Sequence, residues 1–276
     1  MRRWGAVRTI GLAVAAVVAV GVLFQLPASP FSRHGYPQRS VVPASIQSTR
    51  PAPDAPSPAR PEVSPRVTTR PRVAISYPMV GPQKYAVLPG DAVLPGDAAV
   101  IGRAGRLLRF QIVIESGIAG LDQNGFARFV RTTYGAAAGW ASHGLWRFQQ
   151  VGPGANPDFM LMLVTPQTRD ALCGGTDRYT SCRMGNRVVL NVARWVHGVP
   201  KYAASLTTYR QYMLNHETGH RLGRGHELCP GPGQPAPVMQ QQTLGLHGCT
   251  AYAWPYVNGA RYTGRLGQYD DHVPHA

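Results

Sequence analysis

HETGHRLGRGH, at residues 216–226, is the stretch of sequence that decides the fold of this chain. His216 and His220 are four positions apart, so on a helix both imidazoles project from one face, about one turn apart. Gly223 can adopt the left-handed conformation that ends a helix, which a side chain would penalise. The turn that follows brings His226 back toward the same face. The stretch therefore predicts a helix that ends at a metal ion with three nitrogen ligands.

Three histidine ligands leave the fourth position of a tetrahedral zinc ion open for water, which is typical of catalytic zinc sites. Glu217 follows the first ligand and is placed to act as general base for that water. The alternative is that the histidines only lie on the solvated face of an ordinary helix. A match of five fixed residue types over eleven positions is rare by chance, however. The pattern indicates a zinc hydrolase.

The stretch resembles the long zinc-binding motif of the metzincin metalloproteases, in which a methionine turn follows the third histidine. Met239 follows His226 by thirteen residues, after a proline-rich connection. The resemblance implies that Met239 forms a hydrophobic floor beneath the metal, whereas a methionine taken alone would only fill the core. With Glu227 directly after the third histidine, the stretch also resembles the astacin branch of the family. However, Gln241 stands two residues after Met239, where that branch has a tyrosine.

A longer string, residues 209–245, is similar to an actinobacterial surface-protein family known only as a domain of unknown function, number 3152. Its most distinctive part is CPGPGQPAPVMQQQ at residues 229–242. The similarity extends over residues 85–270, approximately. It implies a metzincin-like fold: a twisted sheet with helices, the zinc helix and an irregular carboxyl-terminal part. It implies no particular substrate.

The first 26 residues have the pattern of a membrane-targeting segment. Three arginines precede an apolar run over residues 10–24, and no further charge appears before Arg33. This pattern is typical of an N-terminal membrane anchor or of a cleaved signal peptide. Pro27 and Pro30 crowd the small residues that signal peptidase would need, which favours the anchor. Either alternative exports the rest of the chain.

Residues 27–83 hold more than half of the 25 prolines and show hardly any hydrophobic periodicity. Such a composition predicts an extended, semi-rigid linker of polyproline character. The expected organisation is therefore a membrane segment at 1–26, a disordered proline-rich linker at 27–83 and a folded domain at 84–276. The domain is long enough to bury one hydrophobic core.

The net charge of +15 resembles that of a nucleic-acid-binding protein, but it is unevenly spread. Residues 1–26 carry +3 and residues 27–83 carry +5, which leaves +7 for residues 84–276. The domain shows no basic cluster with interleaved aromatic residues. We therefore expect no nucleic-acid partner. We expect the positive charge instead to attract the domain to anionic polymers and lipid head groups of the cell envelope.

Four cysteines, an even number, lie in the exported part of the chain, which suggests two disulfides with three alternative connectivities. We expect the local pairs, Cys173 with Cys182 and Cys229 with Cys249. The second pair would close a loop around Met239 and hold it against the zinc helix. A cysteine zinc site is disfavoured because no Cys-x-x-Cys occurs and the histidines already supply a full ligand set.

The periodicity of the domain predicts an α+β fold. Residues 108–114 alternate between apolar and mostly polar positions, as in a half-buried strand, and Asp122 can cap a helix over 123–138. Further strands are expected at 146–148, 158–164 and 187–191. A helix opened by Thr207 or Thr208 carries the zinc ligands, and the chain after Gly223 reads as loop.

These features together predict a membrane-anchored, extracytoplasmic zinc metallopeptidase that cleaves a peptide or protein substrate with zinc-activated water and Glu217 as base. The alternative localisation is secretion after cleavage of a signal peptide. Two alternative functions stay open. One is a non-catalytic zinc domain that binds the envelope or a partner protein, which would not need Glu217. The other is a zinc amidase of cell-wall peptides, which the motif cannot separate from a peptidase.

Overall fold

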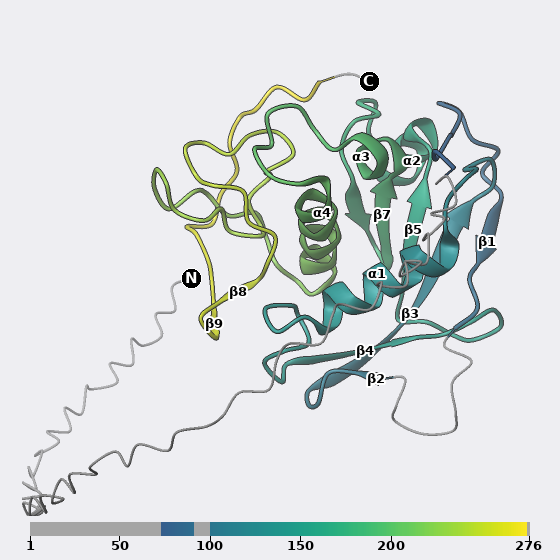
Figure 1. The fold of residues 1–276 in the computed structure, drawn as a ribbon, viewed down its shortest axis with the longest axis horizontal. Helices are drawn as coiled ribbons and strands as arrows, with labels where there is room; N and C mark the ends of the chain where they lie inside the picture. Colours follow the sequence, from purple (N-terminus) through teal and green to yellow (C-terminus); the bar gives the residue numbers. More distant parts are fainter. Residues whose placement is uncertain (1–72, 91–99, 275–276) are drawn as a thin grey trace, which may run out of the picture. The chain divides into compact units, whose positions relative to one another are not determined.

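The computed structural model describes residues 73–90 and 100–274, and its fold is drawn in Figure 1. Seven strands form one mixed sheet, in the order β2-β4-β3-β5-β7-β6, with β1 also pairing with β3. The strands of this sheet are β1 (Tyr85–Val87), β2 (Val100–Ile101), β3 (Arg106–Glu115), β4 (Trp146–Gln150), β5 (Phe159–Val164), β6 (Cys182–Met184) and β7 (Arg187–Asn191).

The four central strands run parallel, and the three short strands run antiparallel to their neighbours. β4 and β1 share one edge of β3, because β4 pairs with residues 106–110 and β1 with residues 113–115. The other end of the described sheet is β6, whose one strand partner within residues 73–90 and 100–274 is β7. The strands expected at 146–148, 158–164 and 187–191 are confirmed with small changes at their ends.

Helices cover both faces of the sheet. The helices are α1 (Gln123–Gly135), α2 (Pro166–Cys173), α3 (Val192–His197) and α4 (Leu206–Arg221). The main core joins α1, α3 and α4 to one face, and a smaller cluster on the other face includes Leu172 and Cys173 of α2. Asp122 caps α1 through the Gly125 amide, as expected, although the helix ends three residues early. The α+β fold class is confirmed at this level.

From Phe110 to Glu115, β3 is buried on both faces, not half-buried as its alternation predicted. Gln111, Val113 and Glu115 are each less than 10 % exposed. The carboxylate of Glu115 accepts hydrogen bonds from the Thr165 amide at 2.7 Å and the Thr168 hydroxyl at 2.6 Å. Helix α2, which the periodicity did not predict, thus covers the face that was expected to meet solvent.

Residues 73–83, which we assigned to the linker, contact the domain. Ser76 forms an antiparallel bridge with Ala119, and the Gly81 amide donates to the hydroxyl of Thr165 at 3.0 Å. Ile75 and Tyr77 pack against the main core. These contacts extend the folded region ahead of residue 84. The predicted membrane segment and most of the linker lie outside the described residues, and within the described part of the chain no helix is long and apolar enough to span a membrane.

The part of the chain after α4 is mostly irregular, as expected. It contains the small hairpin of β8 (Tyr256–Val257) and β9 (Ala260–Arg261), and Figure 1 shows α4 between the sheet and these loops. Both predicted disulfides are confirmed: Cys173 is bonded to Cys182 and Cys229 to Cys249. The second bridge closes the loop that contains Met239.

Candidate metal centre

Residues next to α4 in the sequence cap the helix at both of its ends. Ser205 is its N-cap and accepts a hydrogen bond from the Thr208 amide, so the helix starts slightly before the predicted threonines. At the other end Gly223 has a φ of 82°. Its amide donates to the carbonyl of His220, and the Arg224 amide donates to Gly219, which is the bonding pattern of a Schellman motif. The expected left-handed turn at Gly223 is confirmed.

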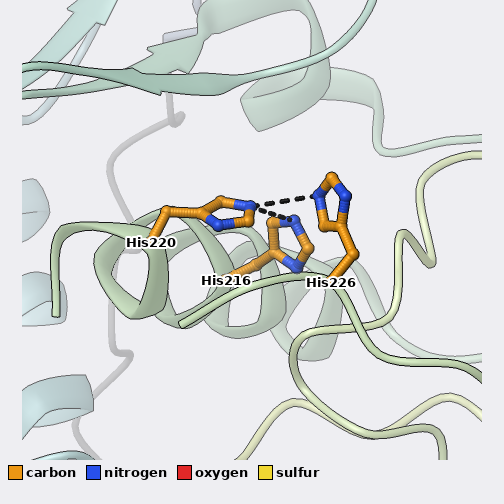
Figure 2. Close-up of side chains that lie close together, drawn as sticks. All are labelled: His216, His220 and His226. Atoms are coloured by element: carbon orange, nitrogen blue, oxygen red, sulfur yellow. Dashed lines mark hydrogen bonds between the residues drawn. The ribbon is translucent and has the colours of Figure 1, made fainter. Parts of the chain in front are cut away.

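This turn brings the three predicted histidines together, as Figure 2 shows. His216 and His220 extend from one face of α4, and His226 comes from the loop after it. The Nε2 atom of His220 lies 3.2 Å from Nε2 of His216 and 3.1 Å from Nε2 of His226. Their ligand atoms all lie within 4.8 Å of one another, so the group could hold a metal ion.

The outer nitrogen of each ring meets a hydrogen-bond acceptor. Nδ1 of His216 lies 2.8 Å from the carbonyl of Val238, and Nδ1 of His220 lies 2.8 Å from the carbonyl of Arg224. A carbonyl oxygen can only accept, so both rings carry their proton on Nδ1. Nδ1 of His226 faces Oε1 of Gln268 at 3.0 Å in the same way. Three Nε2 lone pairs therefore point at one another.

This arrangement fits a zinc ion. Nε2 of His220 lies 3.1–3.2 Å from the Nε2 atoms of the other two histidines, and lone pairs on nitrogens this close repel one another unless a cation lies between them. Zn–N bonds of about 2.0–2.1 Å at the tetrahedral angle place neighbouring ligand nitrogens about 3.3 Å apart, close to the observed spacing. The set of three neutral imidazoles is also one that zinc favours.

The histidines are poised to bind a metal at neutral pH. Burial, with the neighbouring imidazoles, lowers the pKa of His216 well below its usual value, and burial lowers that of His220 to about 4. Burial also lowers the pKa of His226. Since a metal binds only the neutral ring, protons compete weakly for these nitrogens at pH 7.

Glu217 lies beside the histidines and lines the same cavity of about 430 Å³. It is 6 % exposed, and within the described chain its carboxylate makes no hydrogen bond or ion pair. Burial raises the pKa of Glu217 to about 8, although the cations Arg169 and Arg183 oppose the shift. A carboxyl group with this pKa can hold or release a proton near neutral pH.

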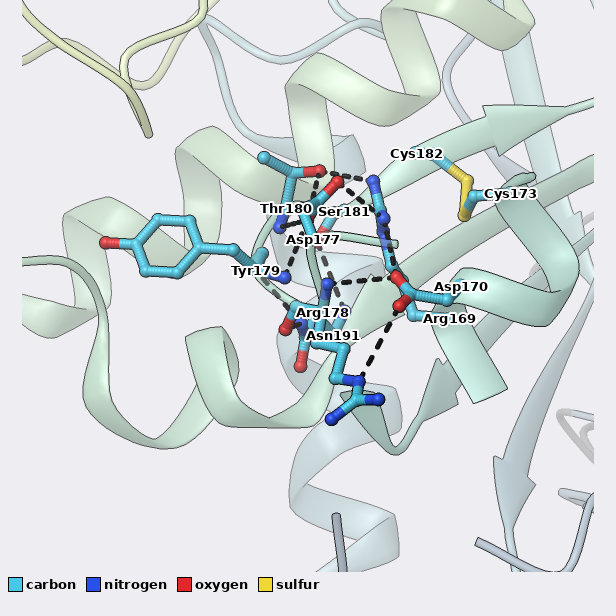
Figure 3. The surroundings of a disulfide bond; sticks show 10 residues. All are labelled: Arg169, Asp170, Cys173, Asp177, Arg178, Tyr179, Thr180, Ser181, Cys182 and Asn191. Carbon is cyan, nitrogen blue, oxygen red and sulfur yellow. Dashed lines mark hydrogen bonds and ion pairs between the residues drawn. A yellow bond between two sulfur atoms is a disulfide. The ribbon is translucent and has the colours of Figure 1, made fainter. Parts of the chain in front are cut away.

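One wall of the cavity is a polar cluster that the sequence did not reveal. Figure 3 shows Arg169 of α2 beside the Cys173–Cys182 disulfide. Its guanidinium donates to Asp170 at 2.9 Å and to Asp177 at 2.8 Å, and it also bonds Thr180. Arg169 is only 5 % exposed. The cluster fixes the loop that leads into β6, the strand beside α4.

Met239 is fully buried and packs against the last turns of α4, next to His220. A Cβ atom on Gly219 would overlap Sδ of Met239 and would lie 3.0 Å from Cζ2 of Trp140. The indole of Trp140 in turn donates to the carbonyl of Asn215 at 2.9 Å. Met239 therefore supports the helix beside the ligands, and its place beneath a bound metal stays a prediction. Glu227, singled out earlier, forms an ion pair with Arg261 at 3.1 Å and lies outside the cavity lining.

Comparison with known proteins places the chain in a family. Residues 76–257 match the family described as Protein of unknown function (DUF3152), and the chain belongs to it. No curated protein and no solved structure matches the chain. The family similarity inferred from residues 209–245 is thereby confirmed, and the family brings no activity with it.

Proposed function

We propose that the chain is a zinc-dependent metallopeptidase with a metzincin-like fold, anchored in the membrane with its catalytic domain outside the cell. The observation that carries the proposal is the convergence of three Nε2 lone pairs beside the buried Glu217, whose carboxylate makes no hydrogen bond or ion pair with the described residues. A structural zinc site would need a fourth protein ligand. Here the space beside the three rings opens into the cavity instead.

The order of the elements supports the metzincin-like assignment. Strands and a helix precede the zinc helix, a left-handed glycine turn leads to the third histidine, and a buried methionine follows in an irregular part. Met239 packs directly on the helix that carries two of the ligands. These are the features that the long zinc motif implies.

Each residue of the site has a role in the proposed hydrolysis. The three imidazoles would hold zinc, which when bound lowers the pKa of a water molecule and polarises a carbonyl group. Glu217 accepts the proton of the attacking water at its carboxylate and passes it to the leaving nitrogen. The burial that raises its pKa to about 8 makes the protonated form accessible near neutral pH, as the second step requires.

The position of strand β6 beside the cavity supports an extended peptide as the substrate. Among the described residues β6 pairs only with β7, so its other edge presents backbone groups without a strand partner there, next to the cavity that Cys182 and Arg183 help to line. Extended peptides commonly bind by adding a strand to such an edge.

The experiment that tests the proposal is the substitution Glu217→Gln in the zinc-loaded protein. Glutamine keeps the size of the side chain but cannot take up the proton, so peptide hydrolysis should fall by at least about 100-fold with zinc content unchanged. Glu227→Gln is the matched control, since Glu227 follows the third histidine but pairs with Arg261. This control should lower stability and leave the rate within a few-fold of wild type.

Three outcomes would contradict the proposal. Equal rates for wild type and Glu217→Gln would remove Glu217 from the mechanism. Absence of any turnover of peptides and cell-wall peptides by the zinc-loaded wild type would instead favour a non-catalytic zinc domain, and turnover of cell-wall peptides alone would favour an amidase.

The membrane anchor rests on the arginines and the apolar run within residues 1–26. The proposed domain would then face anionic polymers of the cell envelope, to which its positive charge is suited. Full-length protein should stay in the membrane fraction through a carbonate wash. A soluble exported protein whose N-terminus lies near residue 30 would establish a cleaved signal peptide and a secreted enzyme.

A further inference from the structure

The end of the described chain returns to the metal site. We call residues 264–273 the C-terminal segment. The Gly267 amide donates to the carbonyl of His226 at 3.0 Å, and the Leu228 amide donates to the carbonyl of Arg265 at 2.8 Å. Glu227 and Leu266 form an antiparallel bridge between these two bonds. The C-terminal segment thus pairs as a short strand with the residues that begin at the third histidine.

Side chains hold the C-terminal segment in place. The ring of Tyr269 stacks on His247 with 3.5 Å between ring centroids, and its hydroxyl accepts from the Cys229 amide at 3.2 Å. His247 also contacts the carboxylate of Asp271 at 2.9 Å. Since Cys229 is bonded to Cys249, these contacts fasten the segment to the disulfide-closed loop. Farther along, Val273 lines the cavity of the candidate site.

Gln268 lies between these attachments, and among the described residues its Oε1 is the only hydrogen-bond partner of Nδ1 of His226, at 3.0 Å. His216 and His220 receive backbone carbonyls as acceptors and are fixed by the helix that carries them. His226 stands on a loop and depends on a side chain from 42 residues away. Gln268 also lies beyond residue 257, where the match to the family ends.

We propose that Gln268 is a positioning residue for the third metal ligand. By accepting the Nδ1 proton of His226, it fixes both the tautomer and the plane of the ring, so that Nε2 faces the other two histidines. The inference rests on the metal binding proposed above. Removing such a partner typically lowers metal affinity 10–100-fold. Gln268 is exposed, so water can partly replace it, and we expect a loss near tenfold.

The test measures zinc affinity of the full-length protein by competition with a chromophoric chelator. Gln268→Met keeps the length of the side chain and removes the acceptor, so the zinc dissociation constant should rise about tenfold. Gln268→Glu keeps the acceptor oxygen and should bind zinc at least as tightly as wild type. Gln234→Met is the matched control, because Gln234 is exposed in the disulfide-closed loop and its hydrogen bonds with the described residues all use its backbone. It should bind zinc like wild type.

A double-mutant cycle separates positioning of His226 from a general effect of the C-terminal segment. In a His226→Ala background, Gln268→Met should cause no further loss of zinc affinity, because the ring that it orients is gone. An equal loss in both backgrounds, or an affinity of Gln268→Met within twofold of wild type, would overturn the inference. A wild type that binds no zinc would contradict the proposed metal centre itself, so the two failures are distinguishable.

Discussion

Gly219→Ala is the change that tests most sharply how helix α4, which carries His216 and His220, is packed. Inside a helix, alanine is normally more stable than glycine by about 1 kcal/mol. Here the added methyl group would overlap Sδ of Met239 and lie 3.0 Å from Cζ2 of Trp140. Both neighbours are almost completely buried, so neither can move into solvent.

The clash should outweigh the gain in helix propensity. Overpacking a core typically costs about 1–3 kcal/mol or more, and overlap with a sulfur atom belongs at the upper end of that range. The flexible methionine side chain can yield part of the space. We therefore expect a net loss of about 1–2 kcal/mol in the free energy of unfolding of the metal-free chain. Urea unfolding followed by tryptophan fluorescence measures this difference.

Two further variants make the reasoning refutable. Gly225→Ala is the matched control, because no atom lies within 4 Å of its added Cβ, and it should be neutral or slightly stabilising. In a Met239→Ala background, Gly219→Ala should be clearly less destabilising, since the methyl group then enters the space that the methionine left and only the contact with Trp140 remains. A stabilising Gly219→Ala, or an equal loss with and without Met239, would refute the packing argument.

The remaining predictions concern the bridged loop and the pH dependence of stability. Replacing Cys229 and Cys249 by serine opens a bridge between residues 20 apart, which should cost about 3 kcal/mol in urea unfolding; an unchanged midpoint would contradict this. Burial raises the pKa of Glu217 from 4.5 to about 8, so the folded metal-free chain keeps a proton that the unfolded chain releases. Stability should therefore fall as pH rises from 6.5 to 8, and Glu217→Gln should reduce this decline. Parallel declines in the two proteins would show that Glu217 is not the group responsible.

The clustering of the three histidines could be predicted because local chain geometry alone brings them together. The spacing of His216 and His220 matches one helical turn, and Gly223 permits the left-handed turn that returns His226. The disulfide pairs were also predictable, since each joins cysteines that are close in sequence. The strands at 159–164 and 187–191 followed from their apolar runs.

Features that depend on contacts between distant residues could not be predicted. The alternation over 108–114 indicated one buried face, but α2 covers the second face and gives Glu115 buried partners. The role of Gly219 becomes visible only once Met239 is seen against it. Nothing local to Gln268 marks it as a neighbour of His226, because its place depends on the path of the chain between these two residues, which are 42 positions apart.

The number of zinc ions bound per chain tests the central claim most directly. Elemental analysis of the purified protein should find about one zinc per chain in the wild type, held by the three convergent imidazoles. His220→Ala removes the ring that lies 3.1–3.2 Å from both others and should lose most of that zinc. A wild type without zinc, or stoichiometric zinc in His220→Ala, would contradict the account.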